Sequence, residues 1–212
     1  MEQIYSRQLH FGMVYRAALA QAVVKLGYAI RHTHGDGRFE IEGISKEAIQ
    51  SFSQRREAIE TALEERGLHG AKASEQAALK TREHKRDVDK AELLHDWKER
   101  ALILGLSPHV LIEQSKEKQV NLKVKSPEKI QALAAEAVDY ARKHLAERQS
   151  AFLQDELQKV ALSHALGELA PVDVRLAIDA AITQGSLITG RYQDAKYLTT
   201  PEAKAQELHN IE

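Results

Sequence analysis

Apolar residues recur along most of the chain at the spacing of one helix face. The first group consists of Leu9, Met13, Ala17, Ala20 and Val24. Because its members are three or four positions apart, they predict an amphipathic helix over residues 9–24. Gly27 follows at a position where glycine commonly ends a helix.

A second apolar stripe contains one charged member. The stripe is formed by Ile49, Phe52, Arg56, Ile59 and Leu63. Ser45 precedes it as a suitable N-cap for a helix. Two interpretations of Arg56 are open. Its aliphatic stem can pack on the apolar neighbours while its guanidinium pairs with a carboxylate, or the guanidinium can bind a phosphate. We favour the paired arginine.

The next two predicted helices differ in their apolar content. Residues 72–88 predict a polar, alanine-rich helix. Asp89 and Glu92 resemble a capping box that opens a further helix, which Gly105 closes. The apolar stripe of that helix is Leu93, Trp97, Ala101 and Leu104. Trp97 is therefore expected to be buried.

Alternating apolar and polar residues mark two short extended segments. Residues 28–32 and 38–42 flank the turn signal Asp36-Gly37, which predicts a β-hairpin. Residues 120–124 also alternate and fit either a short strand or an extended linker. We place a domain boundary there.

The last part of the chain has the element order of a winged-helix module. The predicted elements are a long helix begun by Ser126-Pro127, a short strand at 151–153, helices at 155–166 and 171–184, and a hairpin over 187–199. The second short helix carries Asp173, Arg175 and Asp179, whereas a helix that recognises bases in the major groove favours Arg, Lys, Asn or Gln. The module is thus interpreted as a packing or protein-binding unit.

The predicted fold class is mainly α with short β-hairpins: a helical N-terminal part and a winged-helix-like C-terminal module. Three parts are expected. Residues 1–66 form a helix, a hairpin and a helix; residues 67–118 form a helical linking region; residues 119–212 form the long helix and the winged-helix-like module.

Composition indicates a globular chain with an aliphatic core. Hydrophobic residues make up 43%, charged residues 29% and aromatic residues 5%, and the formal net charge is −1. The chain has no cysteine, which excludes a disulfide framework and a cysteine nucleophile. No apolar run approaches the ~20 residues of a membrane span, and the first residues do not resemble a signal peptide. We expect a cytoplasmic protein with no membrane partner.

Few residue patterns suggest catalysis. The sequence has no phosphate-cradling glycine loop. His32, His34 and Asp36 could converge on a metal ion, but a polar hairpin tip explains them better. Tyr5, Tyr15 and Tyr28 could supply a nucleophile only beside a metal or a base, so packing is the favoured interpretation. No cofactor and no bound metal are expected.

Basic residues form the most suggestive cluster. The candidate DNA-binding residues are Arg55, Arg56, Lys80, Arg82, Lys85 and Arg86. Arg82, Lys85 and Arg86 share one helix face. They form either a solvated face or a track for phosphates that binds single-stranded DNA weakly and without sequence preference. Two further groups are Lys116, Lys118, Lys123 and Lys125, and Arg142, Lys143 and Arg148.

Several of these runs resemble conjugative relaxase–helicases of the TraI/TrwC (MobF) type. The similar segments are residues 15–20, 26–28, 37–44, 49–56 and 78–82, Lys85, Val88, Asp89 and Trp97, and residues 198–202 with Glu207. The resemblance implies a segment from the end of the relaxase domain to just before the helicase core. Proteins of this family nick plasmid DNA, remain attached through a tyrosine, unwind the duplex and pass through a type IV secretion system.

The resemblance also implies which activities to expect. The family's nucleophilic tyrosines and metal histidines lie before the similar segments, and its ATP-binding loop lies after them. We therefore expect no enzymatic activity, and as partners single-stranded DNA, the type IV secretion coupling machinery, and the remaining relaxase and helicase domains. The alternatives are a stand-alone winged-helix DNA-binding regulator and a metal nuclease built on His32, His34 and Asp36.

Overall fold

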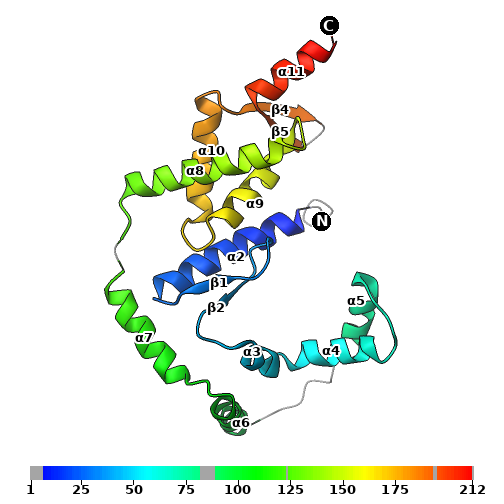
Figure 1. Ribbon diagram of the computed structural model, residues 1–212, viewed down its shortest axis with the longest axis vertical. Coiled ribbons are helices and arrows are strands. Elements are labelled where there is room, and N and C mark those ends of the chain that lie inside the picture. Colours follow the sequence, from blue (N-terminus) through cyan, green and yellow to red (C-terminus); the bar gives the residue numbers. More distant parts are fainter. Residues whose placement is uncertain (1–6, 82–88, 123, 193–194, 212) are drawn as a thin grey trace. The chain divides into compact units, whose positions relative to one another are not determined.

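The computed structural model describes residues 7–81, 89–122, 124–192 and 195–211. The described chain is mostly helical with two small antiparallel sheets (Figure 1). It forms two compact units. Unit 1 combines residues 1–42 with residues 114–212, and unit 2 comprises residues 43–113. In the described part of the chain, no helix is long and apolar enough to span a membrane.

The N-terminal part of unit 1 is a helix followed by a hairpin, as predicted. Helix α2 is Gln8–Lys25, and strands β1 (Ile30–His32) and β2 (Phe39–Ile41) pair antiparallel, with Arg31 opposite Glu40. Gly27 follows α2 with a φ of +89°, a conformation that suits glycine. The predicted helix end and the predicted turn are both confirmed.

The C-terminal part of unit 1 also follows the predicted element order. Its elements are α8 (Pro127–Ala146), β3 (Phe152–Leu153), α9 (Gln154–His164), α10 (Pro171–Thr183), β4 (Ile188–Tyr192), β5 (Ala195–Thr199) and α11 (Pro201–Ile211). The three strands form an antiparallel sheet in the order β3-β5-β4. The Ser126 hydroxyl caps α8 by accepting a hydrogen bond from the Lys129 amide at 3.3 Å.

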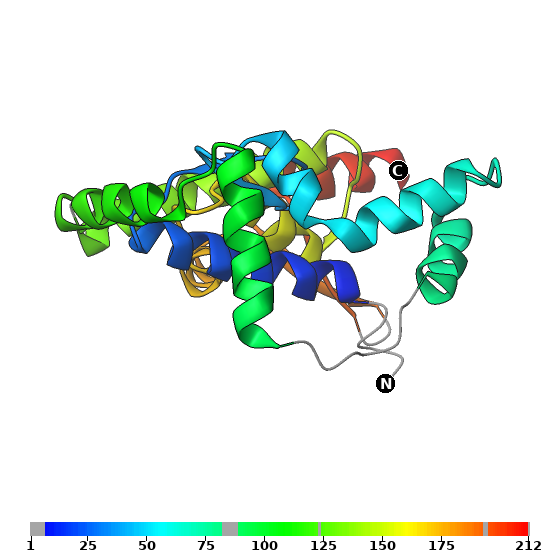
Figure 2. The same ribbon diagram turned by 90° about the horizontal axis from the view of Figure 1, so that it is seen from below.

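One core joins the two parts of unit 1. Met13, Ala17 and Ala20 of α2 are buried and belong to the same apolar cluster as α8, α9 and α10. The members from these helices are Ala134, Ala137, Val138, Ala141, Leu145, Leu157, Ala161, Leu162, Val174 and Ile178. Helix α2 packs against α9, and α8 packs against α9 and α10 (Figures 1 and 2). The many alanines let these helices approach closely.

Polar contacts also join the segments of unit 1. Arg7 pairs with Asp155 at the start of α9, with one guanidinium nitrogen 2.6 Å from a carboxylate oxygen. The Ser163 hydroxyl donates to the Gly35 carbonyl in the β1–β2 turn at 2.9 Å. The two ends of α9 are therefore tied to residues more than a hundred positions earlier.

Unit 2 consists of short helices. They are α3 (Lys46–Phe52), α4 (Gln54–Glu64), α5 (Ala71–Lys80) and α6 (Lys90–Ile103). Ser45 and Asp89 cap their helices as predicted: the Ser45 side chain accepts from the Ala48 amide, and Asp89 accepts from the Ala91 amide rather than from the Glu92 amide of the expected capping box. Helix α7 (Pro108–Val120) begins in unit 2 and ends in unit 1.

Three sequence predictions differ from the structure. The apolar stripe over residues 49–63 belongs to two helices, because the backbone turns at Ser53, whose hydroxyl donates to the Ile49 carbonyl at 2.7 Å. The helix predicted over 72–88 ends at Lys80, and residues 82–88 lie outside the described part of the chain. The described residues from 121 to 126 form no strand, which favours the linker interpretation.

The predicted divisions after residues 66 and 118 do not coincide with the limits of the compact units. The reason is physical: residues 1–42 bury their apolar face against helices that lie beyond residue 126. The division into residues 1–66, 67–118 and 119–212, which rests on the family resemblance, stays a prediction.

The contact between Gly27 and α7 yields a stability test. A Cβ on Gly27 would overlap the backbone carbonyl oxygen of Ser115 and lie 2.9 Å from the Gln119 amide nitrogen. Gly185 has a similar φ of +77° with open space around it. We expect Gly185→Ala to cost about 1–2 kcal/mol for its conformation alone. Gly27→Ala should cost about 1–3 kcal/mol more, because backbone atoms must also move.

Urea denaturation followed by circular dichroism measures both variants. Equal losses of unfolding free energy in the two variants would contradict the packing of α7 against the end of α2.

Candidate nucleic-acid interface

The candidate DNA-binding residues that can be placed all lie in unit 2. Arg55 and Arg56 are in the first turn of α4, and Lys80 ends α5; all three are exposed. Helices α4 and α5 pack against each other. Arg82, Lys85 and Arg86 lie outside the described residues, so the phosphate track over residues 80–86 stays a prediction.

The environments of the two α4 arginines differ. Arg56 Nε donates to Glu60 Oε1 at 2.7 Å, and both side chains are largely exposed. Its pairing with a carboxylate is confirmed, but its expected place in an apolar stripe is wrong because the helix breaks at Ser53. Among the described residues, Arg55 has no ion pair within 4.0 Å. Arg55 is therefore the better-suited of the two to meet a phosphate.

The described basic residues of unit 1 outside the candidate set are partly neutralised. Lys125 Nζ lies 2.9 Å from a Glu168 carboxylate oxygen. Arg142 and Lys143 each lie 2.7 Å from Asp139. Hydrogen bonds from Lys143 and then from Arg142 lower the pKa of Asp139 below its ordinary value. These pairs explain why the cluster near the end of α8 is a weak candidate for phosphate binding.

Unit 2 also contains an apolar groove that the sequence did not predict. It lies between α3 and α6 and has a volume of about 780 Å³. Ile49, Phe52, Leu94, Trp97, Ala101 and Leu102 are among the residues that line it. Trp97 is 46% exposed, so its expected burial is wrong. The smaller Ala101 of the same stripe is the buried member, and it also lines the groove.

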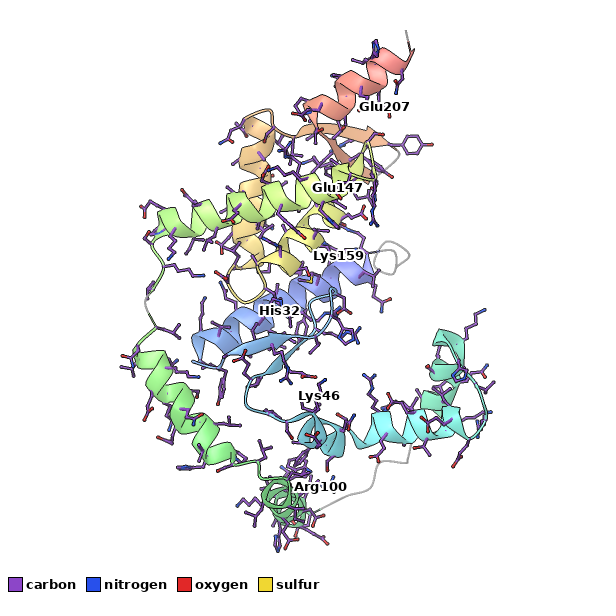
Figure 3. All side chains as sticks on the ribbon, viewed as in Figure 1. His32, Lys46, Arg100, Glu147, Lys159 and Glu207 are labelled. Carbon is purple, nitrogen blue, oxygen red and sulfur yellow. The ribbon has the colours of Figure 1, made fainter. Side chains whose placement is uncertain are left out.

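Arg100 links α6 to α3 at the edge of this groove. Its guanidinium lies over the Phe52 ring, 5.8 Å from the ring centroid, and donates to the Ser51 carbonyl at 3.2 Å. Arg100 on α6 thus contacts the end of α3, whose first residue is Lys46 (Figure 3). These two contacts hold the walls of the groove together and fix the orientation of the Phe52 ring.

The hairpin tip is organised by ion pairs. Arg38 Nε lies 2.9 Å from Asp36 Oδ2, and Arg16 Nε donates to the Asp36 carbonyl at 2.9 Å. The His34 ring lies 3.0 Å from the Thr33 hydroxyl. Among the described residues, no three His, Asp or Glu side chains come together as a metal site would require. The contacts of Asp36 with Arg38 and Arg16 fit the polar hairpin tip that the sequence predicts.

Two of the three candidate tyrosines lie in the described part of the chain. Tyr15 is 67% exposed on α2, contrary to the expected packing, and Tyr28 is partly buried after the end of that helix. Tyr5 lies outside the described residues.

Comparison with known proteins gives a relaxase signal for the first half of the chain. Residues 1–103 match the family model described as TrwC relaxase. The multifunctional conjugation protein TraI of Escherichia coli strain K12 is 32% identical over 97 residues, which is 46% of this chain and 5% of that protein. A second Escherichia coli TraI is 31% identical over 96 residues, again 5% of its length. No solved structure matches the chain.

The Asp36 carboxylate yields a pH prediction. The hydrogen bond from Arg38 lowers the pKa of Asp36 below its ordinary value of 3.8. A carboxylate with a lowered pKa stabilises the fold above its unfolded-state pKa, and the stabilisation is lost as the pH falls through the folded-state pKa. We expect Asp36→Asn to reduce the unfolding free energy at pH 7 by about 1 kcal/mol or less, because the pair is partly exposed.

The same substitution should have a progressively smaller effect as the pH falls below 3.8, the ordinary pKa that Asp36 has in the unfolded chain, and through the lowered pKa that it has in the folded protein. Urea unfolding of both proteins across this range measures the difference. A difference that grows on acidification would contradict the role given to the Arg38 contact.

Proposed function

We propose that the chain is a non-catalytic segment of a conjugative relaxase that contacts single-stranded DNA during plasmid transfer; its similarity over residues 1–103 to the TrwC relaxase family model, and over 97 residues to TraI, supports the proposal. The observation that carries the proposal is this match, together with the exposed cations and the groove residues Phe52 and Trp97 that lie inside the matched segment. The matched segment covers 5% of each TraI relative.

Its non-catalytic role is supported by the arrangement of the candidate chemical groups. The hairpin tip uses Asp36 for ion pairs with Arg38 and Arg16. Tyr15 projects from α2, and the described residues hold no cluster of metal-binding side chains beside it. A tyrosine nucleophile for strand transfer needs a metal or a base close to it.

Contact with single-stranded DNA is supported by the exposed cations of unit 2. Arg55 and Lys80 can each approach a phosphate without giving up an ion pair in the described part of the chain. Arg56 would first have to leave Glu60. With Glu57, Glu60 and Glu64 on the same helix, α4 should bind DNA weakly and without sequence preference.

The C-terminal part of unit 1 is a candidate for protein contacts. We infer that α8 to β5 form a winged-helix-like module, since a helix, a strand, two helices and a hairpin follow one another and the strands form one sheet. Asp173 and Asp179 on α10 disfavour a stand-alone DNA-binding regulator, the alternative function. Exposed Val172 and Leu176 on that helix suit a contact with the type IV secretion coupling machinery.

The proposal is tested by DNA binding at several salt concentrations. Fluorescence anisotropy of a labelled oligo(dT) should show weak binding, and the log of the affinity should fall with the log of salt by about 0.7 per phosphate contact. Arg55→Gln and Lys80→Gln should each flatten that slope by about one contact. Arg56→Gln should change it less because Glu60 already neutralises Arg56.

Lys204→Gln is the matched control, since Lys204 is an exposed cation on α11 in unit 1. The oligonucleotide should be recovered intact after incubation with Mg²⁺ or Mn²⁺. Binding that is absent even at low salt would contradict the DNA contact. Cleavage that disappears in His34→Ala would contradict the non-catalytic role.

A further inference from the structure

We propose that the groove between α3 and α6 is a binding site for unpaired nucleobases, which stack on Trp97 and Phe52. The inference rests on the proposed function and deepens it, because it assigns base contacts to a surface separate from the cations of α4 and α5. It places the bases in the groove and the phosphates at its rim.

The two aromatic side chains of the groove are partly exposed from opposite walls. Phe52 ends α3 and is 39% exposed, and Trp97 lies on α6 and is 46% exposed. Both line the groove, whose other lining residues are mostly aliphatic. Stacking on an aromatic ring suits any base, because every base has a π-face.

The charges at the groove favour a polyanion. Of the described residues that line it, Lys98 and His109 are the titratable ones, and none is acidic. Arg100 adds a guanidinium over the Phe52 ring. Bases on the rings would bring the phosphates of the same strand to this cationic rim, as in other single-strand-binding grooves.

A single strand fits this arrangement better than a duplex or a protein helix. Bases in a duplex are already stacked on one another, so they cannot reach Trp97 without being flipped out. An apolar protein helix would be satisfied by aliphatic walls alone. The groove offers two partly exposed rings, and the titratable residues that line it are basic. A single strand can stack its bases on such rings and place its phosphates beside such residues.

Trp97 is the only tryptophan in the chain, so its emission reports on the groove directly. We expect oligo(dT) to quench this emission in a saturable way. An abasic oligonucleotide of equal length, which carries the phosphates without bases, should quench it far less. A duplex of the same length should also quench it less than the single strand does.

The affinity for labelled oligo(dT), measured by fluorescence anisotropy, tests how much stacking on Trp97 contributes to the binding free energy. Trp97→Leu should weaken binding by about 5- to 100-fold, the range for loss of one stacked base. Trp97→Phe keeps a ring and should retain most of the affinity, which separates stacking from general damage to the fold. Tyr192→Leu is the matched control, because Tyr192 is an exposed aromatic residue of unit 1.

The outcomes separate this inference from the proposed function. If oligo(dT) binds but neither quenches Trp97 nor loses affinity in Trp97→Leu, the groove site is wrong and the DNA contact of the cations stands. If no binding is detected at low salt, both are wrong. If an acidic amphipathic peptide shifts the Trp97 emission and oligo(dT) does not, the groove takes a protein helix and the nucleobase site is overturned.

Discussion

The packing of α2 against α9 and α10 is the constraint on which the rest of unit 1 depends. Met13, Ala17 and Ala20 form the inner face of α2, and they are buried in one cluster with residues of α8, α9 and α10. Alanine lets the helix axes come close, so a larger side chain here would have to displace its neighbours. Residues 1–42 thus belong to the relaxase-matched sequence yet complete their core with residues outside the match.

Several basic residues of the two units differ in whether a carboxylate pairs with them. In unit 1, Arg7 and Lys125 pair with carboxylates of other segments, Asp155 and Glu168, and Arg142 pairs with Asp139 of its own helix. In unit 2, Arg55 and Lys80 are exposed, and the groove between α3 and α6 keeps Trp97 accessible. The surface that we propose for DNA thus lies in unit 2, whose described buried apolar residues are Ala48, Ala77 and Ala101.

Local signals predicted the elements well, and long-range contacts were beyond them. Ser45, Asp89 and Ser126 cap their helices as expected, and Gly27 and Gly37 adopt the positive φ that their turns require. Periodicity could not show that Ser53 breaks a continuous stripe. Periodicity also does not show which residues of an apolar stripe the fold covers. For this reason the sequence predicts a buried Trp97 and gives no sign of the groove that Trp97 lines. The pairing of Arg56 followed from its chemistry, but its neighbour Glu60 could be chosen only from the structure.

Native-state hydrogen exchange tests the shared core most directly. Helices α2 and α9 should unfold together in the opening events that expose their amides, because each buries its apolar face on the other. Leu162→Ala, at a fully buried position of α9, should lower the opening free energy of the slowest amides in both helices by the same amount, about 2–5 kcal/mol. Amides of α2 that keep their protection while those of α9 lose it would show that residues 1–42 fold independently, and would contradict the account.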